Sequence, residues 1–201
     1  MKLTNDQLDA LQELINIGVG RAASTLNQMV NAHIYLQVPF ITVVPLLDVK
    51  EQLKARLNEN PLSSVQLSFN GLFSGVAQLV FPTDSASTLV AILTGEELGT
   101  PELDSVKIGT LTEIGNIVIN GVMGSISNIL RQHLDYSLPL YVEADIDHLL
   151  TTENFDPDVA ILFAQARFKI EQLHIMGDII LIFKVGSLDA LLSVLELGIE
   201  A

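Results

Sequence analysis

Apolar residues near the N-terminus recur at spacings of three, four or seven, which is the repeat of one face of an α-helix. The stripe consists of Leu8, Leu11, Ile15, Ala22, Leu26 and Met29. Thr4 and Gln7 match a capping box, in which each side chain bonds the other residue's backbone N–H. The pattern predicts a helix from about Asn5 to Val30.

The periodicity then changes to that of β-structure. Residues 34–44 are rich in β-branched and aromatic side chains, and Pro39 and Pro45 predict a strand with a break at proline. The runs 65–69 and 76–81 flank Asn70-Gly71 and predict a hairpin. A short helix over 83–93 follows, ending at Gly95.

The second half of the chain repeats this order at an offset near 100. Residues 13–17 align with 113–117, and Pro39 aligns with Pro139. We expect a helix over 106–134, strands near 139–147, 159–169 and 174–185, and a helix over 187–197. The predicted fold class is α+β, with a pseudo-two-fold internal duplication and a six-stranded, mainly antiparallel sheet. Two long helices carry the candidate sites, and residues 1–201 form a single domain built of two repeats, about 1–99 and 100–201.

Composition narrows the range of partners. The chain has 201 residues and 24 acidic against 10 basic side chains, a formal net charge of −14. This charge repels nucleic acid and anionic membrane surfaces, so we expect neither as a partner. There is no cysteine, which excludes a thiol nucleophile and a cysteine metal cluster. No apolar run approaches the roughly 20 residues that span a bilayer, and the N-terminus has no apolar signal region, so we expect a cytoplasmic protein.

Polar residues on the two long helices are the candidate chemistry. At about 100° per residue, Glu13 lies about 40° from Asp9, and Asn16 about 20° to the other side, so the three share one face. The second helix repeats the pair as Glu113 and Asn116. Gly109 stands where Asp9 would be. A solvated helix face is the ordinary explanation, but asparagine is a mediocre helix former, and its presence mid-helix in both copies needs a reason.

The spacing Asp9-x3-Glu13-x2-Asn16-x22-Pro39 resembles the signature of the CheC/CheX/FliY family of chemotaxis phosphatases. The second copy, Glu113-x2-Asn116-x22-Pro139, has the same 22-residue gap. The resemblance implies hydrolysis of the aspartyl phosphate on a CheY-like response regulator.

The resemblance also implies a role for each residue. Asn16 and Asn116 orient the attacking water, because a carboxamide both donates and accepts without adding charge. Glu13 and Glu113 pair with the regulator's active-site lysine, and Asp9 contributes to partner binding. Since Gly109 lacks this side chain, we expect the second site to dock a regulator less well.

The two prolines of the motif are expected to have a structural role, and the chain is expected to need no ion of its own. Pro39 and Pro139 are expected to fix chain geometry, because proline has a locked φ and no N–H. We expect no metal site and no cofactor in this chain, with magnesium supplied by the regulator.

Other interpretations remain open. The same helix faces suit a non-catalytic adaptor that binds a response regulator or the receptor deamidase CheD, or a structural protein. Residues 18–23 match the dinucleotide pattern G-x-G-x-x-A, but they lie inside a predicted helix, where small residues let another backbone approach. The acidic run 143–158, in which Glu143, Asp145 and Asp147 alternate, is either a solvated strand face or a docking or cation-binding surface.

Overall fold

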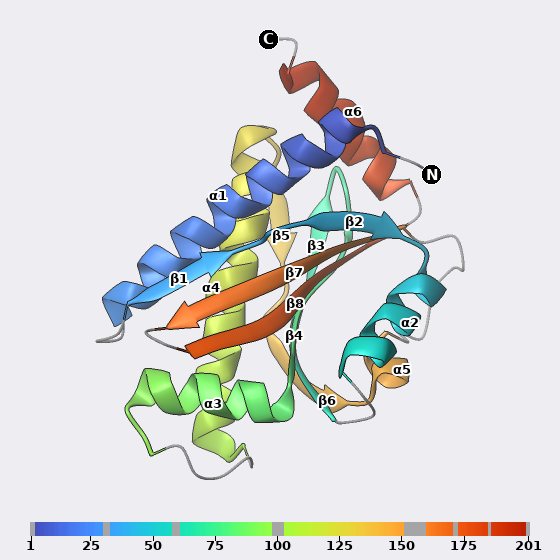
Figure 1. Ribbon diagram of the computed structural model, residues 1–201. Coiled ribbons are helices and arrows are strands. Elements are labelled where there is room, and N and C mark those ends of the chain that lie inside the picture. The colour runs from blue at the N-terminus through green and yellow to red at the C-terminus, as the bar shows by residue number, and fades with distance from the viewer. Residues whose placement is uncertain are drawn as a thin grey trace.

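The computed structural model describes residues 3–29, 33–57, 61–97, 103–150, 160–170, 173–184 and 186–199. Each half gives a long helix, an edge strand in two pieces, a shorter helix, a hairpin and a last helix (Figure 1). The first half contains α1 (Asn5–Met29), β1 (Ile34–Gln37), β2 (Ile41–Val44), α2 (Leu46–Leu57), β3 (Leu62–Gly71), β4 (Gly75–Pro82) and α3 (Thr83–Thr94). The second contains α4 (Ser105–Ile129), β5 (Leu134–Tyr136), β6 (Leu140–Ala144), α5 (Ile146–Leu149), β7 (Ala160–Ile170), β8 (Leu173–Phe183) and α6 (Ser187–Ile199).

The strands form one antiparallel sheet with six positions. Its order is β1/β2, β7, β8, β4, β3, β5/β6, because β1 and β2 both pair with β7 while β5 and β6 both pair with β3. In the central pair, Gln78 of β4 lies opposite Ile180 of β8. These positions are equivalent in the two repeats, so a pseudo-two-fold axis passes between them. The predicted α+β fold with a duplicated antiparallel sheet is confirmed.

The two repeats exchange their edge strands. Ile34 of β1 pairs with Ile170 of β7, and Leu62 of β3 pairs with Ala144 of β6. Each repeat therefore supplies the outer strand of the other repeat's hairpin.

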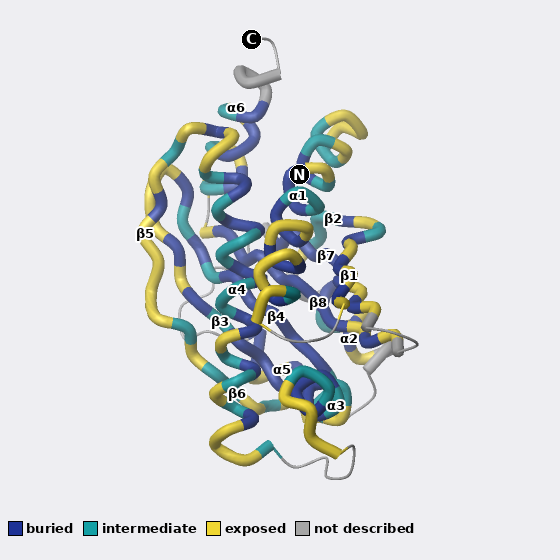
Figure 2. The backbone as a smooth tube through the Cα atoms, turned by 90° about the vertical axis from the view of Figure 1, so that its left-hand side faces the viewer, coloured by how far each residue is buried: buried dark blue, intermediate teal, exposed yellow. Residues whose placement is uncertain are grey.

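Helices cover both faces of the sheet. The larger apolar cluster holds buried side chains of α1, α3, α4 and α6, including Leu11, Ile15 and Val118. The smaller cluster lies on the other face, where Val49 of α2 and Leu149 of α5 cover the sheet. Figure 2 shows the consequence: β4 and β8 are almost entirely buried in the middle, while the edge strand β5 is largely exposed.

The long helices α1 and α4 pack closely because small residues lie where they cross. A Cβ atom added to Gly18 would lie 2.5 Å from the Cα of Val122 and 2.6 Å from the carbonyl oxygen of Gly121. One added to Gly121 would lie 2.7 Å from the carbonyl oxygen of Gly18. The glycines of the G-x-G pattern thus lie within α1, and Gly18 allows the backbones of α1 and α4 to approach closely.

Several predicted boundaries were wrong. The second long helix ends at Ile129 and not at 134, since Arg131 takes a φ of 53° and the chain starts β5 at Leu134. Because β5 pairs with the end of β3, that strand runs through Asn70 and Gly71, and the hairpin turns at 72–74.

Helices α2 and α5 were not predicted. The strand expected over 139–147 ends at Ala144, because Asp145 caps α5. Among the helices described here, none is both long and apolar enough to cross a membrane.

Candidate functional site

Both long helices that carry the candidate residues have side-chain caps at their N-termini. The predicted capping box is present: the Thr4 N–H donates to Gln7 Oε1 at 2.8 Å, and the Gln7 N–H donates to Thr4 Oγ1 at 3.2 Å. In α4 the Asp104 carboxylate accepts from the N–H groups of Val106 and Lys107 at 3.0 and 2.9 Å.

The glutamates of the expected polar faces are exposed on both helices. Asp9 and Glu13 are exposed on α1, and Gly109 and Glu113 occupy the equivalent exposed positions on α4. Neither glutamate forms a hydrogen bond or ion pair with any residue that the structure describes. Both carboxylates are therefore available to a partner.

Asn16 is half-buried, and its amide binds the break between β1 and β2. Its Nδ2 donates to the carbonyl oxygen of Val38 at 2.9 Å, and its Oδ1 accepts from the Val38 N–H at 2.9 Å. The same Nδ2 donates to the carbonyl oxygen of Gln12 at 3.0 Å. An asparagine amide has two hydrogens, so both donors of Asn16 are in use.

Gln12 reinforces this attachment from one turn earlier on α1. Its Nε2 donates to the carbonyl oxygen of Pro39 at 3.0 Å. Asn16 and Val38 are 22 positions apart, so Val38 is the last residue of the 22-residue gap that separates Asn16 from Pro39. We call this set of bonds from Gln12 and Asn16 to Val38 and Pro39 the α1 latch.

The second copy has no equivalent of the latch among the described residues. Thr112 replaces Gln12, and its hydroxyl donates to the Ile108 carbonyl within α4. Ser137, in the break between β5 and β6, binds β3 instead: its N–H donates to the Ser68 carbonyl at 3.0 Å, and its Oγ accepts from the Ser68 N–H at 2.9 Å.

Burial in the two breaks differs accordingly. Val38 is 0% exposed, whereas Leu138 is 89% exposed. Asn116 has one hydrogen bond within the described chain, accepted by Oδ1 from Asn120 Nδ2 at 2.6 Å. Both hydrogens of its amide are therefore uncommitted there, unlike those of Asn16.

The comparisons with known proteins agree with this architecture. The model of the CheC-like family matches residues 7–43, the segment that contains the first motif and the α1 latch. The CheY-P phosphatase CheC of Bacillus subtilis is 26% identical over 144 residues, covering 68% of this chain and 66% of the relative. The flagellar motor switch phosphatase FliY of the same organism is 21% identical over 173 residues, covering 85% of this chain and 44% of the relative. These matches show that the chain is similar in sequence to CheC and FliY over more than half of its length.

Solved structures show the same fold. The crystal structure of FliY from Thermotoga maritima superposes with a TM-score of 0.80 at 20% identity, covering 98% of this chain and 100% of that one. The FliM middle domain from H. pylori superposes with a TM-score of 0.69 at 12% identity, covering 96% of this chain and 99% of that one. This chain thus shares its fold with FliY and with the FliM middle domain.

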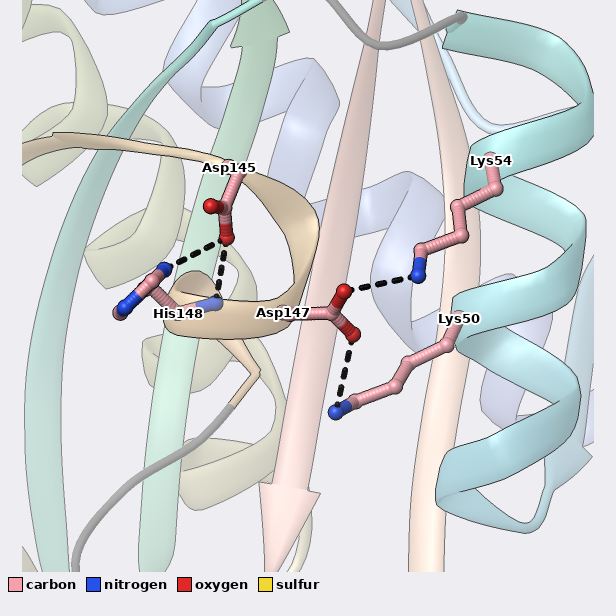
Figure 3. A network of polar contacts seen from close by, with 5 residues as sticks. All are labelled: Lys50, Lys54, Asp145, Asp147 and His148. Carbon is pink, nitrogen blue, oxygen red and sulfur yellow. Dashed lines mark hydrogen bonds and ion pairs between the residues drawn. The ribbon is translucent and has the colours of Figure 1, made fainter.

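The acidic region after β6 is held by neighbouring basic groups (Figure 3). Asp147 on α5 pairs with two lysines of α2, at 3.3 Å from Lys50 Nζ and 2.7 Å from Lys54 Nζ. Asp145 caps α5, accepting from the backbone N–H of His148 at 2.8 Å, and also lies 2.8 Å from the His148 ring. The hydrogen bond from His148 N–H lowers the pKa of Asp145, and the hydrogen bond from Lys54 lowers that of Asp147.

The expected alternation of acidic residues along one strand was therefore wrong for Asp145 and Asp147, which belong to the α5 turn. Only Glu143 lies in β6, where Tyr141 donates to it at 2.9 Å. Within the described part of the chain, no group of three or more His, Asp or Glu side chains is placed to hold a metal. Residues 151–158 of the acidic run lie outside the described residues.

Sequence reasoning missed three contributors to the candidate sites. Val38 acts through its backbone, which leaves no side-chain signal in the sequence. Gln12 and Asn120 each lie four positions from an asparagine of the motif, and this spacing could have indicated them.

Proposed function

We propose that this chain is a phosphatase that hydrolyses the aspartyl phosphate of a CheY-like response regulator. The observation that carries the proposal is the exposed carboxylate of Glu113 one helical turn from Asn116, whose amide hydrogens are uncommitted among the described residues. The relatives named CheY-P phosphatase CheC and flagellar motor switch phosphatase FliY support it.

The proposed mechanism inserts these two side chains into the regulator's active site. An acyl phosphate is already activated, so the main need is a water held in line with the phosphorus. Asn116 positions that water by donating to and accepting from it. A carboxylate next to a phosphoryl group would repel it, so Glu113 is assigned to the regulator's lysine. Magnesium belongs to the regulator, where it neutralises the phosphoryl oxygens.

We assign the same roles to Glu13 and Asn16 in a weaker first site. Before it could donate to a water, Asn16 must release a bond to Val38 or Gln12. The sequence favours the first site for regulator binding, because Asp9 is present there. The uncommitted amide hydrogens of Asn116 favour the second site for hydrolysis. We therefore assign Asp9 and Glu13 mainly to regulator binding and Glu113 and Asn116 mainly to hydrolysis. Pro39 and Pro139, in the two breaks of the edge strands, are assigned to chain geometry.

The test is loss of phosphate from a phosphorylated CheY-like regulator in the presence of magnesium, with and without the protein. We expect acceleration by the wild type, nearly all of it lost in Asn116→Ala. We expect a several-fold smaller loss in Asn16→Ala and a raised KM in Asp9→Ala. Full activity in the Asn16→Ala/Asn116→Ala double variant contradicts the proposal. Binding of a regulator or of CheD without acceleration would support the adaptor instead.

A further inference from the structure

We propose that Asn120 is a positioning residue that orients the amide of Asn116 for catalysis. This inference rests on the proposed function and deepens it for one site. Its basis is the hydrogen bond from Asn120 Nδ2 to Asn116 Oδ1 at 2.6 Å, between side chains one turn apart on α4.

The bond decides which end of the Asn116 amide is presented to a ligand. A carboxamide that flips by 180° exchanges its donor and acceptor ends. In the structure the Asn120 NH₂ group donates to the Asn116 carbonyl oxygen, so that oxygen faces Asn120 and the Asn116 NH₂ group is directed elsewhere. The oxygen keeps a second lone pair, and both hydrogens remain available to a water or a phosphoryl oxygen.

Helix stability does not explain why two asparagines lie here. Asparagine is a poorer helix former than alanine, and an i, i+4 side-chain hydrogen bond offsets only part of the cost of two of them. Asn120 is half-buried and neither fills the core nor caps an end of α4. A function at Asn116 gives the pair a reason.

The first repeat solves the same orientation problem differently. The position equivalent to Asn120 is Gly20, which has open space where a side chain would be. There the backbone N–H of Val38 binds the oxygen of Asn16, and the Val38 carbonyl takes one of its hydrogens. The backbone fixes the first amide but uses its donors, whereas Asn120 fixes the second amide and leaves its donors uncommitted.

The experiment compares three variants of the full chain in the dephosphorylation assay. Asn120→Leu keeps a similar volume but removes the donor. We expect its kcat to fall about 10- to 100-fold, the scale of a misplaced reactive group, with KM unchanged. Asn120→Gln keeps an amide donor and should retain a larger fraction of kcat. Asn128→Leu makes the same change at an exposed position of α4 and should match the wild type.

A second readout does not depend on activity. In the NMR spectrum of this protein alone, without a regulator, the side-chain NH₂ hydrogens of Asn120 should exchange slowly with water. This protection should disappear in Asn116→Ala. Wild-type kcat in Asn120→Leu, or equal exchange in wild type and Asn116→Ala, would overturn the positioning role and leave the proposed phosphatase standing. A wild-type protein without any phosphatase activity would overturn both.

Discussion

Replacing Asn16 with alanine tests whether the α1 latch stabilises the fold. The substitution removes the bonds to both backbone groups of Val38, a residue with 0% exposure, and the bond to the Gln12 carbonyl. The matched control is Asn116→Ala, the same change at the equivalent position of the second repeat. It removes one hydrogen bond, from Asn120.

The expected difference follows from the hydrogen bonds lost. Each bond to Val38 contributes about 0.5–1.5 kcal/mol, and a buried backbone group left unpaired costs about 1–3 kcal/mol. In both variants, the higher helix propensity of alanine raises the free energy of unfolding by about 0.6 kcal/mol. We therefore expect Asn16→Ala to lower the free energy of unfolding by about 2 kcal/mol, and Asn116→Ala to change it by less than about 0.5 kcal/mol.

Equilibrium urea unfolding of the two variants measures this difference, and the thermal midpoint should fall by about 4–8 °C in Asn16→Ala. Asn16→Asp, which keeps the acceptor for Val38 N–H and loses both donors, should be no more stable than the wild type. If both alanine variants unfold at the same urea concentration, the latch does not stabilise the fold and the contrast between the two sites loses its basis.

Three further predictions concern the rest of the molecule. Gly18→Ala should strongly lower the urea midpoint, because its Cβ would overlap the backbone of α4, while Gly20→Ala, with open space, should raise the free energy of unfolding by up to about 1 kcal/mol. The pKa of Asp147 is lowered by Lys54, so its stabilising effect is present above the carboxyl's unfolded pKa and is lost as pH falls through the lower folded value. Asp147→Asn should therefore reduce the urea midpoint at pH 7 and change it progressively less below about pH 4. Burial raises the pKa of Tyr141 to about 12, so its neutral form is favoured, and an ultraviolet titration should lose its highest step in Tyr141→Phe.

The sequence was sufficient for the elements with long, regular patterns. The α1 stripe, the capping box at Thr4 and Gln7, and the repeat at an offset near 100 predicted the helices α1, α3, α4 and α6, the six sheet positions and the duplication. Short elements gave too little pattern. Helix α5 is a single turn that buries Ile146 and Leu149. Its N-cap Asp145 and its Asp147 continue the alternate spacing that begins at Glu143 in β6. A strand and a helical turn could not be distinguished over so few positions.

The candidate site was predictable only in part, for a physical reason. The shared face of Asp9 and Glu13 follows from helix geometry alone, and both are exposed as expected. The environment of Asn16 does not follow, because its partners are the backbone N–H and carbonyl of position 38, which any residue except proline would supply. The two asparagines were therefore expected to be alike, whereas their surroundings differ.

The exchange of edge strands has a consequence for how the chain reaches its native state during synthesis. When β1 and β2 leave the ribosome, β7 has not yet been made. Ile34 of β1 therefore cannot pair with Ile170 until the second repeat has been synthesised. The first repeat therefore emerges with an unpaired strand and a partly uncovered apolar helix, which are the features that invite aggregation. Pairings this distant along the chain also slow folding, since a large loop must close before they contribute. We expect refolding to be slow and sensitive to protein concentration, and co-expressed halves of the chain to assemble with each other more readily than either folds alone.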